Sequence, residues 1–176
     1  APALNDYAAF NLPCRMQTPE GKALAQVIDP YAYRDRYTMP KLILNASGDQ
    51  FFTSDSSRFY YAGLPGLKWL RYTPNVDHFQ GVDTIVAALP WIDDILDNKT
   101  SPQLTWTRED NGTLRIATTT TPKQVKLWQA TNPKARDFRL ESIGPVWASQ
   151  ILKPAADGTY VGTVPQPSSG WTAFLF

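Results

Sequence analysis

Apolar and polar positions follow three patterns along the chain, and the first predicts a pair of strands. Two short apolar runs, Lys41 to Ala46 and Leu67 to Tyr72, are bounded by Pro, Gly and Ser, which is typical of buried strands. Between them Ser54-Asp55 can cap a helix, and we predict one from about Ser56 to Ala62. A strand, a helix and a strand with short connections indicate a parallel pair, the unit of an α/β sheet.

The second pattern, apolar residues at helical spacing, occurs on both sides of this unit. It predicts a helix over Glu20 to Ile28, with Thr18-Pro19 as a suitable start. It also predicts a longer helix from near Val82 to about Asn98, in which Pro90 should introduce a kink. The apolar residues of that longer helix are Ile85, Val86, Leu89, Ile92, Ile95 and Leu96.

The third pattern begins after Lys99. From Gln103 to Phe176, short runs rich in Thr, Val, Trp and Tyr are separated by Gly, Pro, Asn and Asp turn signals, with clear alternation over residues 113–119, 123–130 and 159–164. This predicts a small antiparallel β-sandwich of immunoglobulin or fibronectin type. The predicted fold class is therefore α/β plus all-β, with a boundary near Thr100 to Pro102 that separates residues 1–99 from residues 103–176.

Four tryptophans of the predicted sandwich have two interpretations. Residues of this kind form the surfaces that bind carbohydrate, but at strand positions we favour the hydrophobic core. They are Trp106, Trp128, Trp147 and Trp171.

Composition excludes several classes of function. With 43% hydrophobic and 19% charged residues, the chain of 176 residues reads as an ordinary globular protein. Its net charge of +1 gives no reason to expect a nucleic-acid partner, and no apolar run reaches the length of about 18 residues that a membrane span needs. One histidine and one cysteine, Cys14, are too few for a metal site or an internal disulfide, and we expect no cofactor.

Catalytic chemistry is indicated at the ends of the two predicted strands. Asp49 follows the first strand and His78, the single histidine, follows the second, so both should lie at one edge of a parallel sheet. In α/β-hydrolases the acid and the histidine occupy loops after successive late strands, in that chain order. Neutral His78 would accept the proton of a nucleophile, and Asp49 would orient its ring. The alternative is an ordinary Gly48-Asp49 turn and a solvated histidine beside Asp77.

No nucleophile is evident in these residues. Cys14 would keep the required chain order, but it follows no strand and has no elbow glycines. Ser47 is expected to be a turn residue, and Ser54, Ser56 and Ser57 helix-start residues. Phe51 and Phe52, next to Asp49, are candidates for the wall of a substrate pocket, although burial in the core is the alternative.

Several longer motifs resemble the PhoPQ-activated pathogenicity-related protein family. In the first part they are DPYAYRDR (29–36), MPKLILNASGDQFF (39–52), LPG (64–66) and LRYTPNVDH (70–78); in the second, KLWQATN (126–132), RDFR (136–139) and GWTAF (170–174). The resemblance implies an α/β-hydrolase-like domain followed by a β domain, with Asp49 as triad acid, His78 as triad base and a nucleophilic serine upstream. It also implies association with virulence and a periplasmic or secreted location.

On this basis we expect the chain to be the C-terminal portion of a serine hydrolase, inactive alone, that cleaves a small ester, amide or peptide. Its expected partner is the missing N-terminal half, in the same or a separate chain, or a second copy of itself. The alternative is a non-catalytic effector module that uses the hydrolase scaffold and the β-sandwich to bind protein or glycan.

Overall fold

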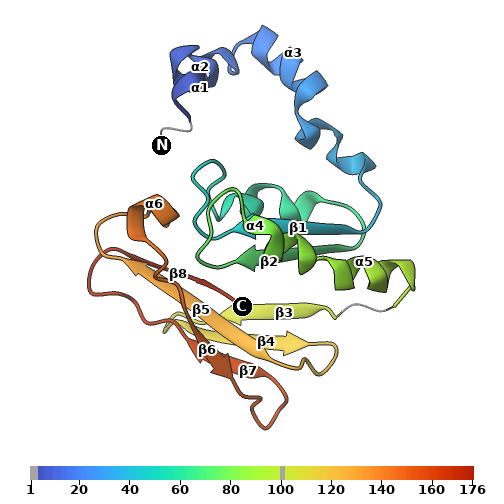
Figure 1. Cartoon of the computed structure of the whole chain (residues 1–176), viewed down its shortest axis with the longest axis vertical. Helices are drawn as coiled ribbons and strands as arrows, with labels where there is room; N and C mark the ends of the chain where they lie inside the picture. The colour runs from blue at the N-terminus through green and yellow to red at the C-terminus, as the bar shows by residue number, and fades with distance from the viewer. Residues whose placement is uncertain (1–3, 100–101) are drawn as a thin grey trace.

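The computed structural model describes residues 4–99 and 102–176, and it begins with a series of short helices. These are α1 (Asn5–Ala9), α2 (Leu12–Arg15), α3 (Pro19–Ile28) and the 3₁₀ helix η2 (Pro30–Arg36). We call residues 4–36 the N-terminal arm, which stands apart from the sheets in Figure 1. The helix predicted over Glu20 to Ile28 is confirmed as α3, and the Thr18 side chain caps it by accepting from Gly21 N.

Strands β1 (Lys41–Ala46) and β2 (Lys68–Thr73) form a two-stranded parallel sheet, as predicted. The second strand begins and ends one residue later than the sequence indicated. The last residues of the two strands, Ala46 and Thr73, are direct partners in the register. The loops that follow β1 and β2 therefore start side by side at one edge of the sheet.

The connection between β1 and β2 differs from the predicted helix over Ser56 to Ala62. It contains two 3₁₀ helices, η3 (Ser56–Phe59) and η4 (Tyr61–Gly63). Serine and aromatic residues fill this segment, and both are weak helix formers. Asp55 provides no cap; its carboxylate instead pairs with Arg136. The helix propensity of this segment is thus too low for an α-helix, and the Asp55 carboxylate that could have capped one is bonded to Arg136.

Two separate helices follow β2, so the prediction of one kinked helix was wrong. They are α4 (Gly81–Val86) and α5 (Leu89–Leu96). Pro90 lies in the first turn of α5, because proline lacks an N–H and its ring clashes with the carbonyl four residues earlier. The rings of Trp91 and Trp69 meet edge to face at 5.7 Å, which packs α5 against the β1–β2 sheet.

Residues 102–176, which we call the β region, contain two antiparallel sheets of three strands. The strand orders are β3-β4-β7 and β6-β5-β8, and a short helix, α6 (Leu140–Ile143), precedes β6. Figure 1 shows the β region beneath the β1–β2 sheet. The strands are β3 (Leu104–Arg108), β4 (Thr113–Thr118), β5 (Val125–Asn132), β6 (Ala148–Leu152), β7 (Tyr160–Thr163) and β8 (Trp171–Leu175).

One cluster of buried side chains joins the two sheets of the β region. Residues from both sheets take part, and buried and exposed positions alternate along β4 and β7 as the sequence predicted. Gly162 allows the close approach, because a Cβ there would lie 2.8 Å from Leu127 Cδ2 on the other sheet. The cluster consists of Leu114, Ile116, Leu127, Leu152, Tyr160 and Val164.

The tryptophans of the β region do not all enter this core. Trp147 is buried, but Trp106 and Trp171 are 49% and 47% exposed, so the core prediction was wrong for these two. The reason is their position: β3 and β8 are edge strands, where one side of a large ring has no neighbouring strand to cover it. The Trp106 ring packs edge-on against Phe174 and Phe176.

Taken together, the described chain mixes helices with one parallel strand pair and two antiparallel sheets, and these strands form no barrel. The predicted domain boundary near Thr100 to Pro102 falls on residues 100 and 101, which lie outside the described residues. Within residues 4–99 and 102–176, none of the helices combines the length and the apolar character that a membrane crossing requires.

Candidate active site

The loop after β1, residues 47–55, which we call the acid loop, holds the Asp49 carboxylate in a fixed orientation. Its Oδ1 accepts hydrogen bonds from the backbone N–H groups of Phe51 (2.7 Å) and Phe52 (2.8 Å). The Asp49 side chain is only 7% exposed. Aspartate commonly bonds its own backbone two residues on, so this turn follows from local sequence. The remaining oxygen, Oδ2, is available to a partner from another loop.

That partner comes from the loop after β2, residues 74–80, which we call the His loop. Nδ1 of His78 lies 3.0 Å from Oδ2 and 3.2 Å from Oδ1 of Asp49. The His78 backbone N–H donates to the side-chain oxygen of Gln50 in the acid loop (3.2 Å). The structure therefore brings together two residues that are 29 positions apart, because β1 and β2 end at the same edge of the sheet.

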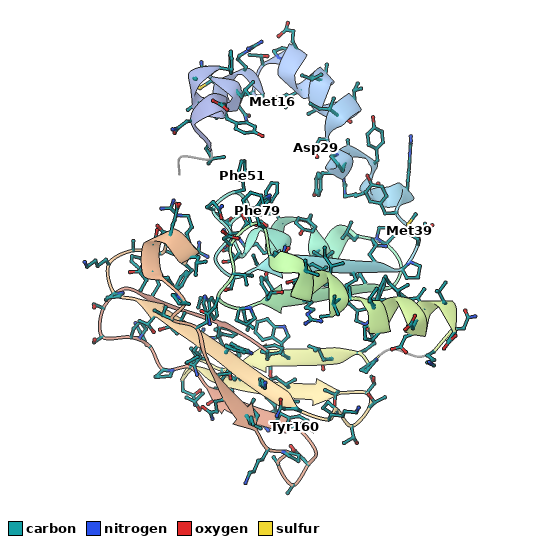
Figure 2. The ribbon with its side chains drawn as sticks, viewed as in Figure 1. Met16, Asp29, Met39, Phe51, Phe79 and Tyr160 are labelled. Atoms are coloured by element: carbon teal, nitrogen blue, oxygen red, sulfur yellow. The ribbon has the colours of Figure 1, made fainter. Side chains whose placement is uncertain are left out.

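Three phenylalanine rings surround the imidazole of His78. Their centroids lie 5.1 Å (Phe51), 5.4 Å (Phe52) and 5.8 Å (Phe79) from that of the imidazole. Phe52 and Phe79 are 64% and 81% exposed, so they form an apolar surface and no core. In Figure 2, Phe51 and Phe79 lie close together at the end of the β1–β2 unit that faces the N-terminal arm.

The His78 side chain is one third exposed, and in the described part of the chain its Nε2 atom has no hydrogen-bond partner. Nδ1 is thus bonded to a carboxylate, while Nε2 is free to bind another group. The rings of Phe51, Phe52 and Phe79, which we call the aromatic collar, surround the imidazole. This is the arrangement that a general base requires, because the open nitrogen can accept a proton.

A comparison with known protein families matches the part of the chain that contains this pair. The model of the PhoPQ-activated pathogenicity-related protein family matches residues 1–139, a range that contains both Asp49 and His78. The chain belongs to this family. This confirms the resemblance that the sequence motifs indicated.

A curated relative matches the chain beyond residue 139. Autocrine proliferation repressor protein A of Dictyostelium discoideum is 31% identical to the chain over 196 aligned residues, which cover 98% of this chain. The same alignment covers 40% of that relative, so the chain spans about two fifths of the relative's length. No solved structure matches the chain.

Two grooves between the β1–β2 sheet and the β region lie near this pair in the PhoPQ-related chain. One, of about 570 Å³, has several aromatic side chains in its lining, among them Trp69, Tyr72 and Trp106. The other, of about 510 Å³, is lined by Asp49 and by charged residues of the β region. His78 lines neither groove. The open nitrogen of His78 is therefore reached from the aromatic collar and not from these grooves.

The charged residues of the second groove form two ion pairs. Burial tends to raise the pKa of Asp55, but the hydrogen bond and charge of Arg136 outweigh it and the pKa is lowered. Hydrogen bonds from Arg139 hold the pKa of the Asp137 carboxyl well below its usual range, in spite of burial. Both carboxylates therefore stay ionised at neutral pH. Asp55 also pairs with Arg58, and Arg139 also pairs with Glu141.

The other sequence candidates do not contact His78. Cys14 is exposed on α2 in the N-terminal arm. Ser47 is buried, and its Oγ accepts from Asn75 N (2.9 Å); Ser57 is paired with the Tyr72 hydroxyl (3.0 Å). The residues that the structure describes include no group of three His, Cys, Asp or Glu side chains that would hold a metal ion.

Sequence reasoning missed two residues of the site. Phe79 follows His78 directly, and Gln50 follows Asp49 directly. Their positions next to the two candidate catalytic residues were the one sequence feature that could have indicated them. Their contacts with the His78 ring and backbone depend on how the two loops meet, which periodicity does not report.

Proposed function

We propose that this chain supplies the acid and the base of a serine hydrolase that cleaves an ester or amide by acyl transfer. The observation that supports this best is the Asp49–His78 contact, 3.0 Å from Oδ2 to Nδ1, with Nε2 open at the surface. In such a site the carboxylate accepts a hydrogen bond from the Nδ1–H group and stays ionised. The lone pair is then on Nε2, where a nucleophile can reach it.

The proposed proton movements are simple. His78 Nε2 accepts the hydroxyl proton of the nucleophile as its oxygen attacks the substrate carbonyl carbon, and the imidazolium then returns that proton to the leaving group. Asp49 holds the ring in position and offsets the positive charge that forms on it. Phe51, Phe52 and Phe79 would line the approach with apolar surface, which favours a substrate with an apolar group next to the scissile bond.

The nucleophile in this proposal is a serine of the full-length protein that lies outside these residues. The length of the curated relative supports this, since the chain covers only 40% of it. We further propose that β1 and β2 are late strands of an α/β-hydrolase sheet and that the β region is a β-sandwich. The parallel register of β1 and β2 and the core shared by the two antiparallel sheets support these assignments.

A fluorophosphonate probe, which reacts with activated serines, tests the proposal in the full-length protein. We expect the full-length protein to be labelled and the 176-residue chain alone to remain unlabelled. Asn in place of Asp49 should lower the labelling rate by about 10⁴-fold, because the ring loses its correct tautomer. Absence of labelling in the full-length protein, or labelling of the chain alone, would contradict the proposal.

Asp77→Asn is a matched control for Asp49→Asn. Asp77 lies in the His loop, and among the described residues its Oδ1 accepts only the backbone N–H of Phe79 (3.1 Å), a bond that asparagine can also accept. We expect the labelling rate of this variant to stay at the wild-type value. An equal fall in both variants would indicate a general effect of lost charge and would count against a specific role for Asp49.

A second function, a non-catalytic effector that binds protein or glycan, is favoured by two observations. The curated relative is named as a repressor of proliferation, and Trp106 and Trp171 are half exposed at sheet edges. Exposed aromatic rings are frequent in such binding surfaces. Under this hypothesis, His78→Ala in the full-length protein should leave its biological activity unchanged, and a large loss of activity would contradict it.

A further inference from the structure

Asn75, in the His loop, joins three segments that are distant in sequence. Its side-chain Nδ2 donates to Trp147 O (2.9 Å) and its Oδ1 accepts from Trp147 N (2.9 Å). Its backbone N–H donates to the hydroxyl of Ser47 in the acid loop (2.9 Å). Trp147 and Ser47 are 6% and 1% exposed, so these bonds are shielded from water.

The residue type is well matched to this position. Asn75 has φ of 60°, in the left-handed region, which asparagine tolerates better than most residues. Its amide offers a donor and an acceptor together, and these match the C=O and N–H of one backbone residue. The pair therefore resembles one rung of a β-ladder, made by a side chain.

A second connection involves Gly48, the residue before Asp49. Its N–H donates to Val76 O in the His loop (3.0 Å), and its carbonyl accepts from Leu140 N at the start of α6 (2.9 Å). The acid loop is thus bonded to the His loop and to the β region one residue from the carboxylate. An ion pair between Asp55 and Arg136 lies farther along the acid loop, but both side chains are more than one third exposed, so the pair should contribute little.

From this geometry we propose that the β region positions the Asp49–His78 pair, through Asn75 and the Leu140 amide. The anchored residues, Gly48 and Asn75, lie one position before Asp49 and three before His78. Because both loops are hydrogen-bonded to the same β region, these bonds restrict how far the loops can move apart. Misplacement of a catalytic group by about 1 Å can cost about 100-fold in rate. The inference rests on the proposed function for its catalytic consequence and on the contacts above for its structural one.

Asn75→Gly removes the side-chain amide and leaves the left-handed backbone unstrained, because glycine adopts positive φ freely. Asn98→Gly is the matched control. Asn98 also has a positive φ, of 53°, and its side chain makes no hydrogen bond to any described residue. A difference between the two variants therefore reports the bonds to Trp147 and not the loss of an asparagine from a left-handed position.

Two measurements separate this inference from the proposed function. In the 176-residue chain, NMR of the His78 Nδ1 proton reports the bond to Asp49 directly, and no other histidine overlaps with it. In the full-length protein, the pH dependence and rate of fluorophosphonate labelling report the chemistry. We expect Asn75→Gly to broaden or shift the proton signal and to lower the labelling rate by about 10- to 100-fold. Asn98→Gly should change neither.

An unchanged Nδ1 proton signal in Asn75→Gly would overturn the inference. If that variant does not fold, Leu140→Pro decides: proline suits the first position of α6, and its ring carbon replaces the N–H that bonds to Gly48 O. A displaced His78 signal in Leu140→Pro supports the positioning role, and a wild-type signal contradicts it. No labelling of full-length wild type would refute the proposed hydrolase, while the NMR comparison would still test the positioning role.

Discussion

Replacement of Gly48 by alanine would place a methyl group where the acid loop, the His loop and α6 meet. A Cβ on this residue would lie 2.7 Å from Leu140 N, 2.8 Å from Leu140 Cβ and 2.9 Å from Val76 O. Ordinary van der Waals contact begins at 3.4 Å, so the nearest atom is about 0.7 Å too close. Two of the three atoms belong to the backbone and cannot rotate away, so one of the segments must move.

The expected cost follows from this overlap. Overpacking of a close-packed site costs about 1–3 kcal/mol. In a protein of this size, 1 kcal/mol corresponds to about 2–4 °C in Tm, so Gly48→Ala should unfold about 2–12 °C below wild type. The same displacement separates the acid loop from the His loop, and the His78 Nδ1 proton signal should shift as the bond to Asp49 lengthens.

Thermal unfolding followed by circular dichroism measures this effect, and Gly63→Ala is the matched control. The nearest atom to a Cβ at Gly63, Arg34 Nε, is 3.9 Å away, and neither glycine has a positive φ. Gly63→Ala should therefore keep or slightly raise the Tm, because alanine has less conformational entropy to lose. Equal Tm values for Gly48→Ala and wild type would refute the close contact between the acid loop and α6.

Three further predictions concern the core, the acid stability and the surface. Leu127→Ala should cost about 2–5 kcal/mol of unfolding free energy in urea, because its side chain is fully buried between the sheets, whereas exposed Lys126→Ala should cost little. The pKa of Asp137 is lower in the folded than in the unfolded chain, so its stabilising contribution is present above the ordinary value of 3.8 and is lost as pH falls. Asp137→Asn should therefore weaken the fall in stability that urea titrations detect below about pH 4. The chain alone should self-associate in light scattering, because the large apolar residues of α3, Leu24, Val27 and Ile28, are at least half exposed; a monodisperse monomer would contradict this.

The sequence determined the candidate site in outline. Apolar runs with polar loops after them predicted β1 and β2, and parallel pairing then required Asp49 and His78 to lie at the same edge. Alternation over Thr113 to Thr119 likewise predicted β4, because a strand buried on one face repeats every two residues. These are local patterns, in which each residue's burial can be read from its neighbours in sequence.

Contacts between residues that are distant in sequence are visible only in the tertiary structure. The bonds between Asn75 and Trp147 join residues 72 positions apart, and no periodicity marks either of them. Exposure of Trp106 and Trp171 depends on which strands lie at the sheet edges, which follows from pairing order and not from composition. The separation between Asp49 and His78 is likewise set where two loops pack against each other and against the β region. Local sequence patterns indicate which residues form the site, and long-range packing determines the distances between them.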